Sequence, residues 1–561
     1  MGVVLVSGAA SAGYAVLGHV RVSAAAVGLE IDALLSADAT PGLRVLYPDP
    51  AARPLWFAPE AREAALATLA DADRDGLPLD SALSDLRAMA DTASTPGGLA
   101  RLDLDLSQAL LRLGDALGRP QVDAASLYGH QWTPAPPRPS DPAARLAASL
   151  AGGAASAAAL DAWAAGLRPS HPGYLRLRAV LARELDLAEL PPLTRDLARG
   201  DSGAAVVALH QRLAAEGHDL AADNRFGHTT VTALQAVQRQ RGLSPSGRLD
   251  RPTRDALNRR RTELIPLLRL NLEKWRWLPR DLGALHVWVN IPRYELVLRE
   301  RAGDAWAEAI RFRAVVGAAD WQTPVFSDTM ETVVFNPTWT VPPSIQRESY
   351  GRVRGRVVRP PGPGNAMGRV KFLFPNAHSV YVHDTPTKWA FGVDDRARSH
   401  GCVRAGDPEG LARELLRRTN GWTAERVAAI FRGPWRGPDP VRVEGVVPVH
   451  LVYFTAEVDA DGRLQVWNDV YDRDPRLAKA LKLELPDLPS DLLATLIADR
   501  IGDEAAVRAE QHEADDAPRD PAAAPDTVPE PPPAERAAPA AKPVDPASDT
   551  TLQIDDDAEV L

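Results

Sequence analysis

The sequence has little cysteine, little methionine and few aromatic residues. Its 561 residues include one cysteine and four methionines, and aromatic residues make up 6%. A single cysteine excludes an intrachain disulfide framework and any metal cluster that needs several thiolates. Cys402 is therefore either an inert buried thiol or a reactive one, and this choice decides most of the function.

The composition otherwise excludes several classes of protein. Hydrophobic residues make up 45% and charged residues 25%, which is ordinary for a soluble globular protein and argues against collagen-like, coiled-coil and polytopic membrane proteins. At about 150 residues per domain, the length predicts three or four domains.

The charge is unevenly distributed. The formal net charge is −10, but residues 502–561 hold sixteen acidic and four basic residues, so this stretch carries −12 and the remainder +2. The stretch is rich in Ala, Pro and Asp, and we expect a disordered acidic tail because it has few large apolar residues. The nearly neutral remainder gives no argument for nucleic-acid binding.

Residues 1–26 could be a signal peptide or membrane anchor. Gly2 to Gly18 carries no charge, and Ala24-Ala25-Ala26 resembles a signal peptidase site. No Lys or Arg precedes the apolar stretch, however, so a misassigned start or an internal helix stays open.

Apolar residues three and four positions apart predict a helical domain over residues 45–190. Residues 196–260 then predict a compact module of three helices, with the first capped at Asp201-Ser202-Gly203. The stretches R-G-D-S-G, L-x-x-R-L and T-x-x-A-L-N resemble the peptidoglycan-binding module, although Val237 stands where that family usually has Phe. A generic helical spacer is the alternative.

Three histidines of this module could suggest a metal site: His210, His218 and His228. No second ligand type stands at a defined spacing, so we interpret them as surface histidines and predict no metal.

From Leu285 onward the apolar pattern alternates, as in strands. Leu285 to Asn290, Tyr294 to Leu298, Phe312 to Val316 and Thr332 to Phe335 are examples. We therefore expect a mostly β domain over residues 270–475, and a multidomain α+β chain as a whole.

Cys402 lies in the stretch Ser399-His-Gly-Cys-Val-Arg404, just before a helix that Asp407 and Pro408 would start. His383 ends an alternating stretch nineteen residues earlier. An imidazole that accepts the thiol proton would create a nucleophile and could later protonate a leaving amine. A cysteine acyltransferase or hydrolase is plausible on these grounds, although an inert buried cysteine is the commoner case.

These motifs resemble the L,D-transpeptidase catalytic domain, the YkuD fold. The resemblance rests on H-D-T-P and S-H-G-C-V-R at this spacing, on Asn336-Pro-x-Trp339 and on Pro360-Pro-Gly-Pro-Gly-Asn365. Together with the helical domain and the peptidoglycan-binding module, it extends to the large YcbB-type branch.

The resemblance implies a role for each matching residue. Cys402 would be the nucleophile and His383 the general base, with the backbone carbonyl of Asp384 holding the imidazole tautomer. Gly401 and Cys402 would supply oxyanion N–H groups. The remaining matches imply a substrate site with Tyr381, His400, Arg404, Trp339 and Ser399. Strand packing is an equal alternative for the two aromatic residues, and loop fixing for Ser399.

The family function implied is transfer of peptidoglycan stem peptides in the periplasm, without a cofactor. Cys402 would attack a tetrapeptide donor, release D-alanine and pass the acyl group to a neighbouring stem as a 3→3 cross-link. Water as acceptor would make an L,D-carboxypeptidase, and a protein lysine would attach protein to the wall. Carbapenems are implied as covalent inhibitors.

One departure concerns the lid of the large branch. Only Ile345 to Arg359 separates Pro342-Pro343-Ser344 from the Pro-Gly-rich motif, and this stretch is basic: Arg347, Arg352, Arg354, Arg356 and Arg359. A short lid would favour hydrolysis, and the arginines could steer anionic stems or lie in a solvated loop.

Two other classes of function compete with the transferase. One is a non-catalytic wall-binding protein whose catalytic domain is a relic. The other is a papain-type protease, which is disfavoured because no Q-x-x-x-x-x-C-W segment surrounds Cys402.

Overall fold

The structure is a computed structural model that describes most of the chain between Tyr14 and Leu485, within a compact unit of residues 1–497. The described residues are 14–17, 20–37, 40–48, 53–133, 141–151, 155–188, 190–215, 218, 220, 223–240, 243–303, 305–343, 345–346, 355, 357–460 and 462–485. The predicted acidic tail and most of the basic lid segment lie outside them.

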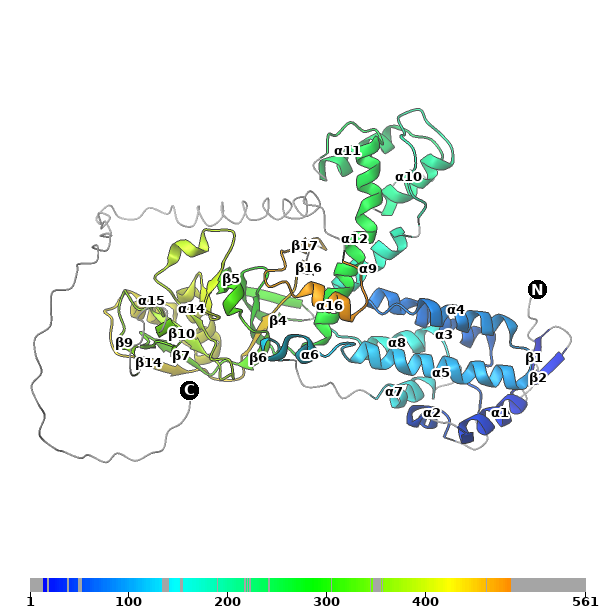
Figure 1. The fold of residues 1–561 in the computed structure, drawn as a ribbon, viewed down its shortest axis with the longest axis horizontal. Coiled ribbons are helices and arrows are strands. Elements are labelled where there is room, and N and C mark those ends of the chain that lie inside the picture. The colour runs from blue at the N-terminus through cyan, green and yellow to red at the C-terminus, as the bar shows by residue number, and fades with distance from the viewer. Residues whose placement is uncertain are drawn as a thin grey trace, which may run out of the picture. The chain divides into compact units, whose positions relative to one another are not determined.

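The first part of the chain is helical, as predicted (Figure 1). After a hairpin of β1 (Tyr14–Leu17) and β2 (Val20–Ser23) come the α-helices α1 (Ala24–Ala37), α2 (Pro41–Leu46), α3 (Pro59–Asp71), α4 (Asp80–Thr92), α5 (Pro96–Gly118), α6 (Ala124–Tyr128), α7 (Pro142–Leu150), α8 (Ala157–Leu167) and α9 (Pro172–Ala188), with short 3₁₀ turns η1 (Ala72–Asp75) and η2 (Gly129–Gln131).

The helical domain begins earlier than the pattern predicted. Helix α1 starts at Ala24, and its Val27 and Ile31 are fully buried in the helical core. The three alanines of the predicted cleavage site thus form the first turn of a packed helix. Among the described residues no helix is both long and apolar enough to span a bilayer.

The three-helix module is present as α10 (Ala204–Ala215), α11 (His228–Gln240) and the start of α12 (Arg251–Arg276). Val237 is fully buried in its core beside Leu234 and Leu209, so the smaller side chain replaces the expected Phe there. The prediction of a surface position is wrong for His210, which is buried. Both of its ring nitrogens have partners inside the module, which makes a buried position possible. Nε2 pairs with the Thr230 hydroxyl at 2.8 Å, and Nδ1 pairs with the Asp223 carbonyl at 3.1 Å.

Helix α12 runs through the boundary that the sequence predicted at residue 260. Its Leu264, Leu268 and Leu272 are buried and continue the helical repeat toward the next domain. With Leu177 and Leu181 of α9 they share one core with Trp288 of the β domain. The third helix of the module is therefore also part of the base of the β domain.

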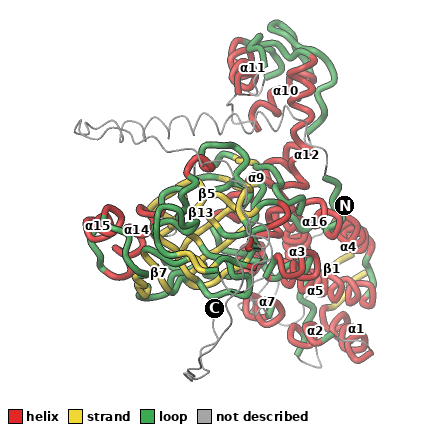
Figure 2. Tube along the Cα trace, turned by 60° about the vertical axis from the view of Figure 1, so that its left-hand side comes forward, coloured by secondary structure: helices red, strands yellow, loops and turns green. Residues whose placement is uncertain are grey.

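Most strands lie together in the β domain (Figure 2). They form an 11-stranded sheet with strand order β14-β7-β10-β11-β13-β5-β4-β3-β15-β6, and β12 pairs with β5 outside this path. The strands are β3 (Leu285–Asn290), β4 (Glu295–Ala302), β5 (Ala305–Gly317), β6 (Phe326–Thr329), β7 (Thr332–Phe335), β10 (Val370–Leu373), β11 (Val382–His383), β12 (Ala397–Ser399), β13 (Val403–Ala405), β14 (Asp439–Arg442) and β15 (Pro448–Val452). Two small sheets pair β8 (Trp339–Thr340) with β9 (Val358–Arg359), and β16 (Ala456–Val458) with β17 (Leu464–Val466).

The predicted strands are confirmed, two of them with the predicted bounds. Strands β3 and β7 match residue for residue, whereas the predicted run from Phe312 lies inside the longer β5. Short 3₁₀ turns η3 (Ala319–Trp321) and η4 (Lys388–Phe391) lie between the strands, and α14 (Pro408–Asn420), α15 (Ala424–Arg432) and α16 (Asp474–Ala480) complete the domain.

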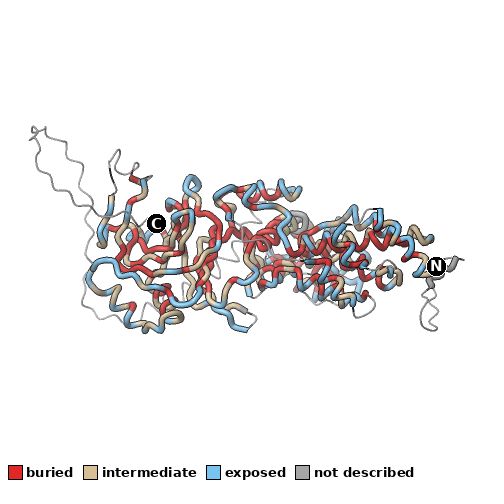
Figure 3. The backbone as a smooth tube through the Cα atoms, turned by 90° about the horizontal axis from the view of Figure 1, so that it is seen from below, coloured by how far each residue is buried: buried red, intermediate tan, exposed pale blue. Residues whose placement is uncertain are grey.

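Helix α14 anchors the segment that carries Cys402. The predicted cap is confirmed, since the Asp407 carboxylate accepts a hydrogen bond from the Gly410 N–H at 2.8 Å with Pro408 at the first position. Leu411, Leu415 and Leu416 are fully buried in the core of the sheet, and buried residues line the interior of the domain (Figure 3). The helix thereby fixes where β13 ends.

Two histidines buried beside Trp288, on the other face of the sheet, predict a pH-dependent stability. Burial lowers the pKa of His450 to about 4 and that of His286 to about 3. Both pKa values lie below the unfolded value of about 6.5, so the unfolded chain takes up protons first as the pH falls, and stability is lost below about pH 6.5. For His450 the loss between pH 7 and pH 5 is about 2 kcal/mol.

Urea unfolding at pH 7 and pH 5 measures this loss in the wild type and in His450→Gln. The Gln amide can keep a hydrogen bond but does not titrate, so the variant should lose about 2 kcal/mol less between the two pH values. An equal loss in both proteins would contradict the assignment.

Candidate active site

The pairing of β11 with β13 determines which side chains share a face. The two strands are parallel, with Val382 opposite Val403 and His383 opposite Arg404. Val382 and Val403 are fully buried in the core. Because side chains alternate along a strand, Tyr381, His383, Cys402 and Arg404 project to the other face, and Cys402 and His383 are diagonal neighbours there.

His383 is held as a neutral imidazole. Nδ1 pairs with the backbone carbonyl of Asp384 at 2.5 Å, so Nδ1 carries the proton and Nε2 is left as the acceptor. Burial lowers the pKa of His383 to about 4, and the nearby Arg404 lowers it further while the carbonyl opposes the shift. This tautomer is the one that a general base needs.

Cys402 is a half-buried, protonated thiol in this state. Burial raises its pKa to about 11, against a hydrogen bond with the Tyr381 backbone and the charge of Arg404, which both lower it. Its Sγ lies 4.0 Å from the Ser379 carbonyl oxygen. Since the pKa of the thiol is high and that of the imidazole is low, the neutral pair is the resting state, and the proton moves only as a bond to sulfur forms.

The loop before Cys402 is fixed by Ser399, whose side chain is buried. Its hydroxyl donates to the Cys402 carbonyl at 2.5 Å and accepts from the Gly401 N–H at 3.1 Å. The Gly401 N–H is therefore engaged in this state, and its role as an oxyanion donor stays a prediction. No described group accepts a hydrogen bond from the Cys402 N–H, which leaves it available for an oxyanion.

Gly401 adopts a backbone φ of +107° that favours glycine. Its carbonyl accepts a hydrogen bond from the Thr323 hydroxyl at 2.8 Å, and the same hydroxyl accepts one from the Gly317 N–H at 2.8 Å. The Tyr471 hydroxyl in turn donates to the Gly317 carbonyl at 2.6 Å and accepts from the Thr323 N–H at 3.1 Å. Thr323 and Tyr471 thus hold the loop of the candidate nucleophile Cys402, which is called the nucleophile loop below.

Asp384 is positioned by three donors to its carboxylate. The Arg369 N–H, the Thr385 N–H and the Lys388 ammonium lie 2.7, 2.6 and 2.6 Å from it. Gly368, with φ of +55°, makes this possible, because a Cβ there would lie 2.2 Å from the carboxylate. The carboxylate is therefore a fixed anchor for the peptide whose carbonyl holds His383.

Two cations share the face of Cys402 and His383. Lys371 is opposite His383 across β10 and β11, with its ammonium 5.8 Å from the Tyr381 ring centre. Burial lowers the pKa values of Lys371 and Arg404. No carboxylate of the described residues forms an ion pair with Arg404, so the face is positive.

The other predicted site residues lie at different distances from Cys402 and His383. His400 is exposed and its ring centre is 5.3 Å from that of Trp321, so these two rings border the loop at Gly401. The Tyr381 ring is 5.7 Å from His383. Trp339 pairs with Arg359 in the β8–β9 sheet and shows no described contact with Cys402 or His383.

Sequence reasoning missed Lys371, Thr323, Tyr471 and Trp321. Lys371 alternates with buried Val370 and Phe372 in β10, so the strand pattern could have placed it on the face away from the core. Tyr471 follows Cys402 by 69 positions with no local signal. The described residues contain no cluster of three or more His, Cys, Asp or Glu side chains placed to hold a metal.

Comparison with known families matches three segments of the chain. Residues 284–443 match the L,D-transpeptidase catalytic domain, YkuD. Residues 41–181 match a scaffold domain, and residues 202–257 match the family described as "Putative peptidoglycan binding domain". The chain therefore contains a YkuD catalytic domain together with a peptidoglycan-binding module.

One curated relative is a Haemophilus influenzae protein named "Putative L,D-transpeptidase", 28% identical over 246 residues. The match covers 37% of this chain and 48% of the relative, so the chain spans about half the length of that protein.

Among solved structures, the L,D-transpeptidase (residues 123–326) of Xylanimonas cellulosilytica is 19% identical, with 46% of this chain and 99% of that chain covered and a TM-score of 0.16. A fused Zn-dependent amidase/peptidase/peptidoglycan-binding domain-containing protein of Clostridium acetobutylicum is 13% identical over 46% of this chain and 99% of its own, with a TM-score of 0.15.

The resting state of the thiol predicts how Cys402 reacts with iodoacetamide. With a pKa of about 11, the alkylation rate should rise about tenfold per pH unit from pH 7 to pH 9, because only the thiolate reacts. Intact-protein mass spectrometry measures the rate cleanly since the chain has one cysteine. A cysteine in a short blocked peptide, with a thiol pKa of about 8.5, serves as control, and its alkylation rate levels off toward pH 9. A plateau for Cys402 below pH 8 would instead reveal a preformed ion pair.

Gly368→Ala tests the anchor of His383. The added Cβ would displace the Asp384 carboxylate, so we expect a loss of about 1–3 kcal/mol in unfolding free energy and a mixed tautomer at His383. Urea unfolding and ¹⁵N spectra of labelled histidines measure the two effects. Gly364→Ala is the matched control because nothing lies within 4 Å of a Cβ there; equal effects of both substitutions would refute the anchor.

Proposed function

We propose that the chain is a cysteine L,D-transpeptidase that acts on peptidoglycan stem peptides. The observation that carries the proposal is the pair of Cys402 and His383 on one face of adjacent parallel strands, with Nδ1 of His383 tied to the Asp384 carbonyl. The match of residues 284–443 to the L,D-transpeptidase catalytic domain supports it.

The acylation step follows from the protonation states. As Sγ of Cys402 attacks the donor carbonyl, its proton passes to Nε2 of His383, and a tetrahedral oxyanion forms near the Cys402 N–H. When the C–N bond breaks, the imidazolium returns the proton to the leaving amine. A thioester remains on Cys402, and D-alanine leaves if the donor is a tetrapeptide stem.

The charges of the face fit an anionic donor. Lys371 and Arg404 flank the reacting pair, and their burial strengthens attraction to a carboxylate that replaces water. Stem peptides carry free carboxylates at the leaving residue and on the side chain of diaminopimelate. Tyr381, whose ring lies near both Lys371 and His383, would border the same groove.

The acceptor determines the product. Transfer to the side-chain amine of a neighbouring stem gives a 3→3 cross-link, and we favour this outcome because the module at residues 202–257 would hold the chain on its polymeric substrate. Hydrolysis to a tripeptide and transfer to a protein lysine use the same thioester. The segment from Ile345 to Arg359 is short for a lid, and a short lid would favour hydrolysis of the thioester.

The proposed cellular location follows from the substrate. Peptidoglycan is outside the cytoplasmic membrane, so we propose a periplasmic protein, exported through or anchored by residues 1–26. The helical domain, the module and the catalytic domain, in this order, support the YcbB-type branch. A carbapenem should acylate Cys402 because its strained lactam carbonyl is an equivalent electrophile.

Incubation with a purified disaccharide-tetrapeptide tests the proposal. We expect a cross-linked dimer and one D-alanine released per dimer, with activity reduced by at least about 10³-fold in Cys402→Ala. Chromatography with mass spectrometry measures both products. Tripeptide without dimer would favour the carboxypeptidase.

The competing function is a non-catalytic wall-binding protein. It predicts unreacted substrate and no carbapenem adduct, with retained sedimentation on peptidoglycan sacculi. Cys402→Ala should sediment as the wild type does under either function, so this variant separates binding from chemistry.

A further inference from the structure

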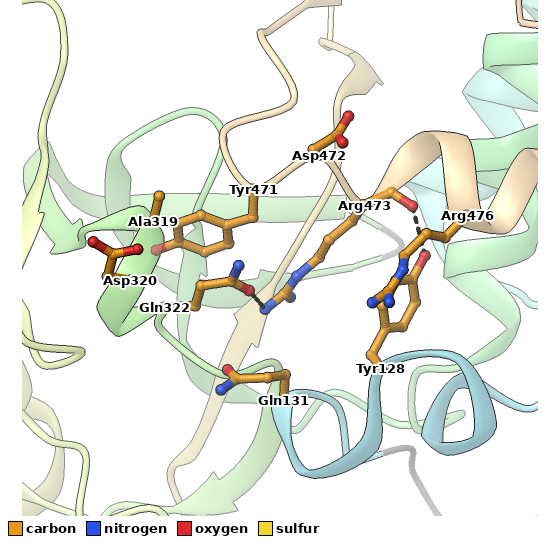
Figure 4. Close-up of a pocket in the computed structure, with 9 residues that line it drawn as sticks. All are labelled: Tyr128, Gln131, Ala319, Asp320, Gln322, Tyr471, Asp472, Arg473 and Arg476. Atoms are coloured by element: carbon orange, nitrogen blue, oxygen red, sulfur yellow. Dashed lines mark hydrogen bonds between the residues drawn. The ribbon is translucent and has the colours of Figure 1, made fainter.

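A cavity lies next to the nucleophile loop, on the side of Gln322 and Tyr471. Its volume is about 360 Å³, and it is lined by Tyr128, Gln131, Ala319, Asp320, Gln322, Tyr471, Asp472, Arg473 and Arg476 (Figure 4). Tyr471 also supports the loop that carries Cys402, but none of these residues lies on the face of Cys402 and His383. A cavity of this size suits a small organic molecule.

Arg473 is the central group of the cavity and is 2% exposed. Four aromatic rings surround its guanidinium, with centres at 4.9–5.8 Å: Tyr128, Trp132, Tyr453 and Tyr471. Its Nη2 donates to the Gln322 side-chain oxygen at 2.8 Å, but Nη1 has no hydrogen-bond partner among the described residues. A buried charged donor without an acceptor is costly, and a carboxylate is the partner that a guanidinium prefers.

The cavity also contains hydrogen-bond acceptors, which complement the donor groups of Arg473. The Gln131 side-chain oxygen is buried and has no donor among the described residues. Two exposed carboxylates, Asp320 and Asp472, line the same cavity. In Figure 4 the Arg473 guanidinium faces the Gln322 side chain and Gln131 lies on another side of it, while Asp320 and Asp472 lie farther away, on different sides of the cavity. The site therefore offers a buried cation for an anion, and oxygens for a nearby N–H group.

We propose that this cavity binds an α-amino-acid group, with its carboxylate on Nη1 of Arg473 and its ammonium toward the Gln131 side-chain oxygen. The group can come from a free amino acid or from the end of a peptide side chain that carries both charges. Acetate has the carboxylate alone and ethylamine the ammonium alone, so neither satisfies both halves of the site.

Binding should be detected at the nucleophile loop. Gln322 and Tyr471 line the cavity. The Gln322 carbonyl lies 3.7 Å from the Cβ position of Gly401, and the Tyr471 hydroxyl bonds Gly317 and Thr323. A ligand that restricts the motion of Gln322 and Tyr471 would make local unfolding of residues 317–323 less frequent.

Calorimetric titration of the full chain carrying Cys402→Ala tests the site without any reaction. We expect saturable binding of D-alanine or of meso-diaminopimelate, and at least tenfold weaker binding of acetate and ethylamine. Tighter binding of D-alanine indicates a free amino acid, and tighter binding of diaminopimelate a stem-peptide end; either supports the site. Slower hydrogen exchange in residues 317–323 should accompany binding.

Two variants locate the binding. Arg473→Gln should weaken it at least about tenfold, and Gln131→Leu, which leaves the aromatic cluster intact, should weaken it even if Arg473→Gln does not fold. Arg436→Gln, an exposed arginine outside the cavity, is the control. No saturable binding by wild type, or equal binding by Gln131→Leu and Arg436→Gln, would overturn the proposal. Because the Cys402→Ala background is used, neither result depends on transpeptidase activity.

Discussion

The parallel pairing of β11 with β13 is the constraint on which the candidate chemistry depends. It places His383 beside Arg404 and leaves Cys402 one residue before the paired segment, on the same face as His383. A shift of register by one residue would turn Cys402 into the core and Val403 out of it. Burial of Val382 and Val403 stabilises this register, so the hydrophobic core selects the register that makes the site.

The position of Cys402 also depends on residues far away in the chain. Thr323 and Tyr471 hold the turn at Gly401, and Tyr471 belongs to the aromatic cluster around Arg473. Tyr128, which follows the first helices, joins the same cluster and donates to the Arg473 carbonyl at 2.9 Å. Helical domain, nucleophile loop and C-terminal helix α16 therefore meet at one buried cation, and a change at Tyr128 could reach Cys402 without touching the catalytic face.

The sequence predicted those elements that depend on the pattern of neighbouring residues. Alternation located β3 and β7, and Asp407-Pro408 located the start of α14. The pattern could not show that Ser399 occupies the Gly401 N–H, because this contact depends on the turn geometry. Nor could it predict the roles of Tyr471 or Gln131, since their partners come from distant parts of the chain. Predictions from local sequence pattern fail where contacts between distant residues determine the structure.

The same energetic consideration applies to Arg404 at the candidate active site and to Arg473 at the cavity. Arg404 and Arg473 are desolvated, and burial lowers the pKa of each. Neither forms an ion pair with a carboxylate of the described residues, whereas buried Arg276 pairs with Glu273 at 3.1 Å. An unsatisfied charged donor costs about 1–3 kcal/mol or more, and a ligand carboxylate would offset that cost on binding. Arg276 thus has the partner expected of a structural cation, while Arg404 and Arg473 have the environment expected of groups that bind anions.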